Sequence, residues 1–186
     1  IIIDKNSCPV LLENLISLIS RLPGLGPKSA RRIALYLLKN KDNLTKPLAE
    51  TLSKAYSEIL RCEICGAIKS SNANCTIKKC HYISNSYEQL CIVENIADMW
   101  AMEATNIYKG HYHILGGTLS ALNGSDPDTL LINSLIERVK KNNVKEVIIA
   151  TSATIEGQTT AHYINDSLKS HNVKITKLAH GLPVGS

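Results

Sequence analysis

The chain has 186 residues, six cysteines and a formal net charge of +5 at pH 7. No run of about 20 apolar residues is present, so the sequence excludes a spanning helix and we expect a soluble, cytoplasmic protein. Residues 1–61 carry ten Lys or Arg against five Asp or Glu, whereas residues 62–186 carry eleven of each. The excess positive charge is therefore N-terminal, which suggests contact with a polyanion. On charge alone, an ordinary solvated basic surface is the better interpretation.

Apolar side chains recur at helical spacing over residues 10–22, which predicts an amphipathic helix. The pattern stops at Leu22-Pro-Gly-Leu-Gly-Pro27, and a second helical pattern begins at Lys28. The sequence therefore predicts two helices joined by a tight hairpin. A third helix is predicted over residues 47–60, directly before the first cysteine of a paired set.

The hairpin has the composition of a phosphate-binding turn. Gly24 and Gly26 permit backbone conformations closed to other residues, so the N–H groups and the positive end of the next helix can approach a phosphate. Lys28, Arg31 and Arg32 add positive charge at the same place. The segment resembles a helix-hairpin-helix DNA-binding motif, which contacts the nucleic-acid backbone and not the bases. The alternative is an ordinary glycine turn between packed helices.

Two close cysteine pairs predict a structural zinc site. The candidate ligands are Cys62, Cys65, Cys75 and Cys80. Sulfur ligands favour zinc, and a complete four-sulfur shell leaves no open position for a substrate. The second pair is wider than the first, so His81 is an alternative to Cys80, and Cys91 is a more distant candidate. Disulfides or free buried thiols remain the alternatives to a metal.

From Glu88 onward, short β-rich runs alternate with helical patterns. Strands are predicted over residues 89–93, 111–115, 144–151 and 173–178, and helices over about 96–105, 128–142 and 159–171. This alternation predicts an α/β layered unit with a mainly parallel sheet. The whole chain is thus expected to be a multidomain α+β protein.

Open α/β sheets place their functional sites at the carboxyl ends of the strands. Glu94 follows the first predicted strand, Asp98 lies four residues on, and Glu156 follows the central strand. Glu94 and Glu156 are expected to meet at one edge of the sheet, where acidic side chains can bind magnesium or receive a basic partner. Acids that cap helices are the structural alternative.

Several motifs in this order carry a family resemblance. They are Leu22-Pro-Gly-Leu-Gly-Pro-Lys-Ser-Ala30, the cysteine pairs, Cys91-Ile-Val-Glu-Asn-Ile-Ala-Asp98, Tyr112-His-Ile-Leu-Gly-Gly117, Ala150-Thr-Ser-Ala-Thr-Ile-Glu-Gly157 and Ala179-His-Gly-Leu-Pro-Val-Gly185. Over residues 10–186 the chain resembles the bacterial RecR family of recombination mediators. The resemblance implies a helix-hairpin-helix domain (1–61), a four-cysteine zinc finger with a linker (62–87) and a Toprim domain (88–186).

The resemblance also implies a function. RecR proteins form ring-like oligomers that clamp DNA, and they act with RecO and RecF to load RecA at gaps during recombinational repair. No catalysis of their own is implied. The competing hypothesis is a metal-dependent Toprim enzyme, such as a nuclease or a primase-like protein, whose acidic cluster supports phosphoryl transfer.

Three departures from the family pattern carry expectations of their own. The family closes its zinc finger with a Cys-x-x-Cys pair, whereas Cys75 and Cys80 are four residues apart. Gln158 replaces the second acid of the family's Glu-Gly-Glu, so any bound magnesium is expected to be weak and a catalytic cluster is disfavoured. The sequence ends at Ser186, before the family's C-terminal segment, so we expect altered oligomerisation.

Overall fold

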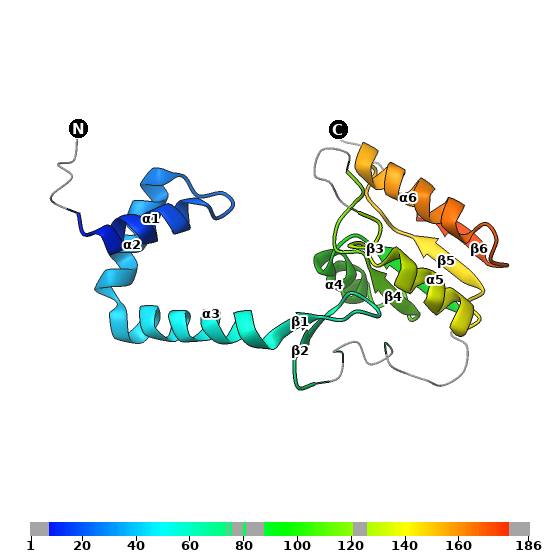
Figure 1. Ribbon diagram of the computed structural model, residues 1–186, viewed down its shortest axis with the longest axis horizontal. Coiled ribbons are helices and arrows are strands. Elements are labelled where there is room, and N and C mark those ends of the chain that lie inside the picture. Colours follow the sequence, from blue (N-terminus) through cyan, green and yellow to red (C-terminus); the bar gives the residue numbers. More distant parts are fainter. Residues whose placement is uncertain (1–7, 74, 76–79, 81–87, 121–125, 179–186) are drawn as a thin grey trace. The chain divides into compact units, whose positions relative to one another are not determined.

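The computed structural model describes residues 8–73, 75, 80, 88–120 and 126–178 (Figure 1). Contacts within the chain divide it into two compact units, Ile1–Ser57 and Glu58–Ser186. The cysteine pairs fall in the second unit together with the sheet, and the division into three domains stays a prediction. None of the helices in the described ranges combines the length and apolar character that crossing a bilayer requires.

The first unit is helical, as predicted. Its elements are α1 (Val10–Ser20), α2 (Pro27–Lys39), a π-helical turn (Lys41–Thr45) and α3 (Lys46–Glu58). Helices α1 and α2 share a small core in which Ile19, Ala30 and Ala34 are buried. The two alanines have short side chains, so the helices can pack closely there.

A β-hairpin follows α3 where the sequence predicted helix. The helix ends at Glu58, and strand β1 (Ile59–Arg61) pairs antiparallel with β2 (Ile68–Ser70). The prediction that α3 continues through Leu60 was therefore wrong. Both strands are only three residues long and mostly exposed, so they show none of the apolar alternation that marks a half-buried strand.

The second unit contains a four-stranded sheet of order β4-β3-β5-β6, in which all neighbours run parallel. The remaining elements are β3 (Gln89–Val93), α4 (Ile96–Thr105), β4 (His111–Ile114), α5 (Ile132–Lys141), β5 (Glu146–Ile149), α6 (Ile155–Leu168) and β6 (Lys174–Lys177). The predicted α/β architecture with a parallel sheet is confirmed.

Helices cover both faces of this sheet (Figure 1). Leu90 and Ile92 of β3 belong to the core that also contains buried residues of α5 and α6. Cys91 and Val93, which alternate with them along the strand, belong to a second core with Met99 of α4. This period of two is expected for a strand that is buried on both sides, which is the usual situation in a parallel sheet.

Two helices begin at other residues than predicted. Helix α5 begins at Ile132 instead of residue 128, because Leu131 has a positive φ of 53° that no α-helix accommodates. Helix α6 begins at Ile155 instead of residue 159, because the Thr154 hydroxyl accepts the N–H of Gly157 at 3.1 Å and caps the helix there.

A buried polar network joins β4 to α5. His113 is completely buried, and its Nδ1 lies 3.0 Å from Nη1 of Arg138 while its Nε2 lies 3.0 Å from the Leu131 carbonyl oxygen. Arginine only donates, so Nδ1 accepts and Nε2 carries the proton. Arg138 also donates to the Tyr112 carbonyl at 2.8 Å. Burial, together with the charge of Arg138, lowers the pKa of His113 to about 3.

This network predicts an acid-sensitive stability. An unfolded histidine has a pKa of about 6.5, so the unfolded chain takes up a proton between pH 6.5 and about 3 that folded His113 refuses. Stability is therefore complete above pH 6.5 and falls with decreasing pH, by up to about 1.4 kcal/mol per unit for one proton. Urea unfolding at pH 7, 6 and 5 should show the unfolding free energy falling with decreasing pH. In His113→Gln the slope should be smaller, by the amount that corresponds to about one proton. Equal slopes for the two proteins would contradict the assignment.

Candidate metal centre and nucleic-acid interface

The four predicted zinc ligands lie together and are buried. The Sγ atoms of Cys62, Cys65, Cys75 and Cys80 are all within 4.8 Å of one another. Cys62 Sγ lies 3.6 Å from Cys80 Sγ, and Cys65 Sγ lies 3.4 Å from Cys75 Sγ. Tetrahedral zinc with bonds of about 2.3 Å requires sulfur atoms about 3.8 Å apart. All six cysteines lie in the described part of the chain and are free, so the disulfide alternative was wrong.

The electrostatics of the cluster also suit a cation. Hydrogen bonding from Cys80 lowers the pKa of Cys65, and the same interaction raises the pKa of Cys80. One thiolate is thus stabilised by its neighbours, whereas several thiolates at this distance repel one another. A soft divalent metal removes that repulsion and permits all four to ionise. The donor set and its spacing therefore fit zinc.

The β1–β2 hairpin positions the first cysteine pair. The Cys62 N–H donates to the Ala67 carbonyl at 2.6 Å, and the Gly66 N–H donates to the Cys62 carbonyl at 2.9 Å. Gly66 has a φ of 79°, in the left-handed region that glycine occupies without strain. These bonds close the tight turn that brings Cys62 and Cys65 to one side.

The metal centre is part of the core of the sheet. The Ile114 N–H of β4 donates to the Cys65 carbonyl at 2.7 Å. The four cysteines share a cluster of buried residues with Cys91, Val93, Met99, Tyr112 and Ile114. Removal of a metal from this cluster is therefore expected to disturb the sheet as well as the hairpin.

Of the two alternatives to Cys80, the structure decides about Cys91 only. Cys91 is not part of the group, because it is buried in β3 and its thiol donates to Met102 Sδ at 3.9 Å. Burial raises the pKa of Cys91 to about 12, which is typical of an inert core thiol. His81 lies outside the described residues.

The predicted phosphate-binding hairpin has the expected backbone. Gly24 has a φ of 78°, and Gly26 is the extended residue that precedes α2. No side chain caps the N-terminus of α2, and Pro27 stands in its first turn. The residues predicted to contact DNA are all exposed: Gly24, Gly26, Lys28, Arg31 and Arg32. The surface they form is open to a ligand.

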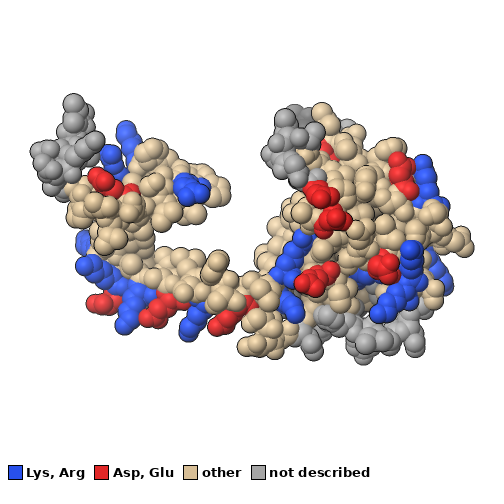
Figure 2. Space-filling view, in the orientation of Figure 1, with Lys and Arg blue, Asp and Glu red and all other residues tan. Residues whose placement is uncertain are grey.

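The positive charge of the first unit is concentrated on α2. This helix contains Lys28, Arg31, Arg32 and Lys39 and no acidic residue. Along α3, by contrast, Lys46, Glu50, Lys54 and Glu58 alternate in sign (Figure 2). The charge of α3 is therefore balanced, whereas every charged residue of α2 is basic.

The carboxyl edge of the sheet contains two of the three predicted acids. Glu94 and Asp98 line a hollow of about 380 Å³, whereas Glu156 is not among its lining residues. Glu94 Oε1 accepts the Ser152 N–H at 2.6 Å, so this carboxylate holds the loop after β5. Among the described residues, only the four cysteines form a group of three or more side chains placed to bind one metal. Glu94, Asp98 and Glu156 therefore do not form a three-ligand metal group, and the pairing of Glu94 with Glu156 stays a prediction.

Gln158 has a structural contact that the acid of the family pattern would lose. Its Nε2 donates to the Ala153 carbonyl at 3.0 Å, which ties α6 to the loop in front of it. A carboxylate in the same position has no proton to donate at neutral pH. Compared with a glutamate, Gln158 thus removes one negative charge from this edge and adds a hydrogen bond that holds the loop.

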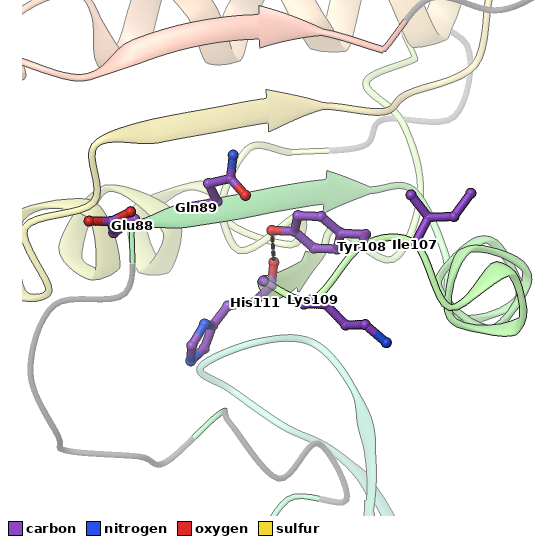
Figure 3. Close-up of a pocket in the computed structure, with 7 residues that line it drawn as sticks. Glu88, Gln89, Ile107, Tyr108, Lys109 and His111 are labelled. Carbon is purple, nitrogen blue, oxygen red and sulfur yellow. Dashed lines mark hydrogen bonds between the residues drawn. The ribbon is translucent and has the colours of Figure 1, made fainter.

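A further hollow, of about 430 Å³, lies at the opposite end of the sheet, where β3 and β4 begin (Figure 3). The Tyr108 hydroxyl, which lines it, donates to the His111 carbonyl at 2.8 Å, and Glu88 forms an ion pair with Lys145 at 2.8 Å. These groups are engaged within the protein. None of the residues predicted from the sequence to bind DNA or metal lines this hollow.

Comparison with known proteins identifies the family. Residues 88–179 match the Toprim domain, and residues 12–56 match the helix-hairpin-helix of RecR. A recombination protein RecR from Pelagibacter ubique is 56% identical over 94% of this chain and 84% of its own length. The chain belongs to the RecR family. Further RecR proteins, from Beijerinckia indica and Hyphomonas neptunium, are 51% and 48% identical over 94% and 98% of this chain and 85% and 89% of their own lengths.

The RecR assignment covers the two parts of the chain in different ways. The helix-hairpin-helix match includes α2 and most of α1 and α3, and the Toprim match includes every strand of the parallel sheet. The cysteine cluster lies between the two matches, so its assignment depends on the spacing and geometry of its own residues. The resemblance to RecR that the sequence motifs indicated is confirmed.

Proposed function

We propose that this RecR-family chain is a DNA-binding recombination mediator without catalysis of its own. In this proposal several copies form a ring-like clamp on DNA and act with RecO and RecF to help load RecA at gaps. The observation that carries the DNA-binding part is the set of exposed basic side chains on α2, which has no acidic residue and follows directly after a glycine hairpin. Family membership supports the role in recombination.

The hairpin is suited to contact phosphates in any sequence. The open N–H groups at the start of α2 and the partial positive charge of its N-terminus attract an anion. Lys28 and Arg32 supply full charges that release counterions from the DNA. Contacts of this kind provide affinity but no discrimination between bases.

The cysteine cluster is proposed to hold one zinc ion per chain through Cys62, Cys65, Cys75 and Cys80. Zinc would supply a structural crosslink there, because four sulfur ligands fill its coordination shell. The first pair comes from the β1–β2 hairpin, and the Cys65 carbonyl is bonded to Ile114 of the sheet. Hydrogen bonds of the chain itself thus place this pair of ligands against the sheet.

The acidic edge is proposed as a docking surface for basic residues of a protein partner such as RecO. Glu94 already accepts a backbone hydrogen bond from Ser152, and Gln158 contributes no charge. This arrangement disfavours the Toprim-enzyme alternative, whose phosphoryl-transfer chemistry needs several carboxylates converging on metal ions. Magnesium at this edge would be bound weakly, and Glu94, Asp98 and Glu156 would act mainly through charge complementarity.

DNA binding provides the direct test. The double variant Lys28→Ala, Arg32→Ala is expected to weaken binding of a fluorescent oligonucleotide about tenfold or more at moderate salt, equally for different sequences. The slope of log affinity against log salt should fall by about 0.7–0.9 for each lost phosphate contact. Fluorescence anisotropy at several salt concentrations measures both quantities.

Lys46→Ala, Lys54→Ala is the matched control, because it removes the same charge from the balanced helix α3. It should leave the salt slope nearly unchanged. Equal losses in the two double variants would mean that net charge, and not the hairpin, determines binding. An unchanged isotherm for the hairpin variant would reject the hairpin as the contact surface.

A further inference from the structure

Arg61, directly before the first cysteine ligand, reaches from the hairpin to the end of β4. Its Nη1 donates to the Thr129 carbonyl at 3.0 Å. Its Nη2 donates to the Ile114 carbonyl at 3.0 Å and also to the Leu115 carbonyl. A single guanidinium thus binds three backbone carbonyl oxygens, which suits its fixed fork of donors.

The same segment is held on its other side by the end of β3. The Leu115 N–H donates to the Val93 carbonyl at 3.0 Å, and the Gly116 N–H donates to the Glu94 carbonyl at 2.8 Å. Gly116 has a φ of 84°, and a Cβ there would lie 2.7 Å from Nη2 of Arg61. The guanidinium therefore occupies the space beside a glycine whose amide is bonded to Glu94.

We propose that Arg61 is a positioning residue that couples metal occupancy of the cysteine cluster to the acidic edge of the sheet. The route runs from Cys62 to Arg61, from Arg61 to the carbonyls of residues 114 and 115, and from the amides of residues 115 and 116 to Val93 and Glu94. The inference rests on the proposed zinc centre and assigns to this chain a connection between its metal site and its proposed docking surface.

The physical basis is the weakness of the hairpin alone. Two strands of three exposed residues have little stability of their own, so the metal orders them. An ordered hairpin fixes the backbone of Arg61. Its side chain then loses less conformational entropy when it forms the three hydrogen bonds. Coupling of this kind is reciprocal, so loss of the Arg61 contacts must weaken metal binding by the same factor by which the metal strengthens the contacts.

A second contact between the hairpin and β4, from the Ile114 N–H to the Cys65 carbonyl, does not pass through Arg61. The shared apolar core is another connection. Variants at Arg61 separate these routes, because they leave the backbone bond and the core side chains unchanged. Arg61→Gln removes the charge and the fork, whereas Arg61→Lys retains the charge and loses the fork.

The test combines zinc affinity with hydrogen exchange in the full chain. Zinc affinity is measured by competition with a chromophoric chelator, and exchange is followed in peptides spanning residues 111–118. Removal of zinc from the wild type should speed exchange in these peptides at least about fivefold more than in peptides of β5 and β6. With zinc bound, Arg61→Gln should speed hydrogen exchange in the peptides spanning residues 111–118. The same variant should weaken zinc binding about tenfold, a typical coupling factor. Arg61→Lys should behave like Arg61→Gln.

Glu63→Gln is the matched control, because Glu63 is exposed between the two cysteines and the substitution also changes one charge. It should leave exchange and affinity unchanged. Zinc bound at one per chain with neither quantity altered in Arg61→Gln would overturn the coupling while leaving the zinc centre intact. A wild type that binds no zinc would instead reject the proposed centre. Uniform acceleration across the whole sheet on zinc removal would replace the Arg61 route by global unfolding.

Discussion

Replacing Cys62 and Cys65 together by serine is expected to abolish stoichiometric zinc binding and to destabilise the second unit by more than about 3 kcal/mol. Both side chains are buried, and their cluster continues into the core around β3 and β4. Serine is a poor zinc ligand, and its hydroxyl would be buried among apolar groups and thiols at a further cost. The variant therefore loses both the crosslink and part of a core.

Metal analysis of the purified protein and urea unfolding measure these two effects. Trp100 is the single tryptophan of the chain and lies on α4, so its fluorescence reports on the second unit. Cys8→Ser is the matched control, because Cys8 lies outside the cluster in the first unit. Substoichiometric zinc in wild-type protein prepared without chelator, or an unchanged midpoint in the double variant, would refute the metal centre.

Sequence reasoning succeeded where the determining interactions are local. The bounds of β3 and α4 agree with the prediction at both ends, because an apolar run is followed by Asn95, whose side chain caps the next helix by accepting the Asp98 N–H at 2.9 Å. The cysteine cluster was equally accessible, since ligand spacing along the chain directly restricts the geometry of a metal site.

Prediction failed where residues distant in sequence determine the structure. Arg61 and Ile114 are separated by 53 positions, and nothing in either local pattern indicates that they meet. The buried pair of His113 and Arg138 is another example, because arginine is usually exposed and histidine is only of intermediate burial, and the tertiary fold alone supplies their partners. The β1–β2 hairpin was missed because its strands are too short for a periodic signal.

The acidic edge shows a third kind of limit. Sequence position correctly placed Glu94 at the end of a strand, but it did not reveal that the carboxylate accepts the Ser152 N–H. An acid at a strand end can bind a metal, receive a partner or hold a loop, and the choice depends on which backbone groups face it. Here the neighbouring loop supplies that group, and Gln158 fixes the same loop from α6.

Replacing Gly66 by alanine is expected to cost more than about 3 kcal/mol of stability in the second unit and to weaken zinc binding. Two effects combine. The φ of 79° places an alanine in the left-handed region, at about 1–2 kcal/mol, and its Cβ would overlap the Ile114 carbonyl oxygen and lie 2.9 Å from the carbonyl carbon. Backbone at the end of the edge strand β4 must then move, which disturbs the bond from the Ile114 N–H to Cys65.

Gly24→Ala separates the two effects, because Gly24 has nearly the same φ, 78°, and a Cβ there would meet nothing within 4 Å. That control should therefore lose only the conformational part, about 1–2 kcal/mol, measured by circular dichroism of the helical first unit. Urea unfolding followed by Trp100 fluorescence gives the corresponding value for Gly66→Ala. Similar losses at both positions would mean that the turn can move away from β4, and that the cysteine cluster does not depend on the close approach of Gly66 to Ile114.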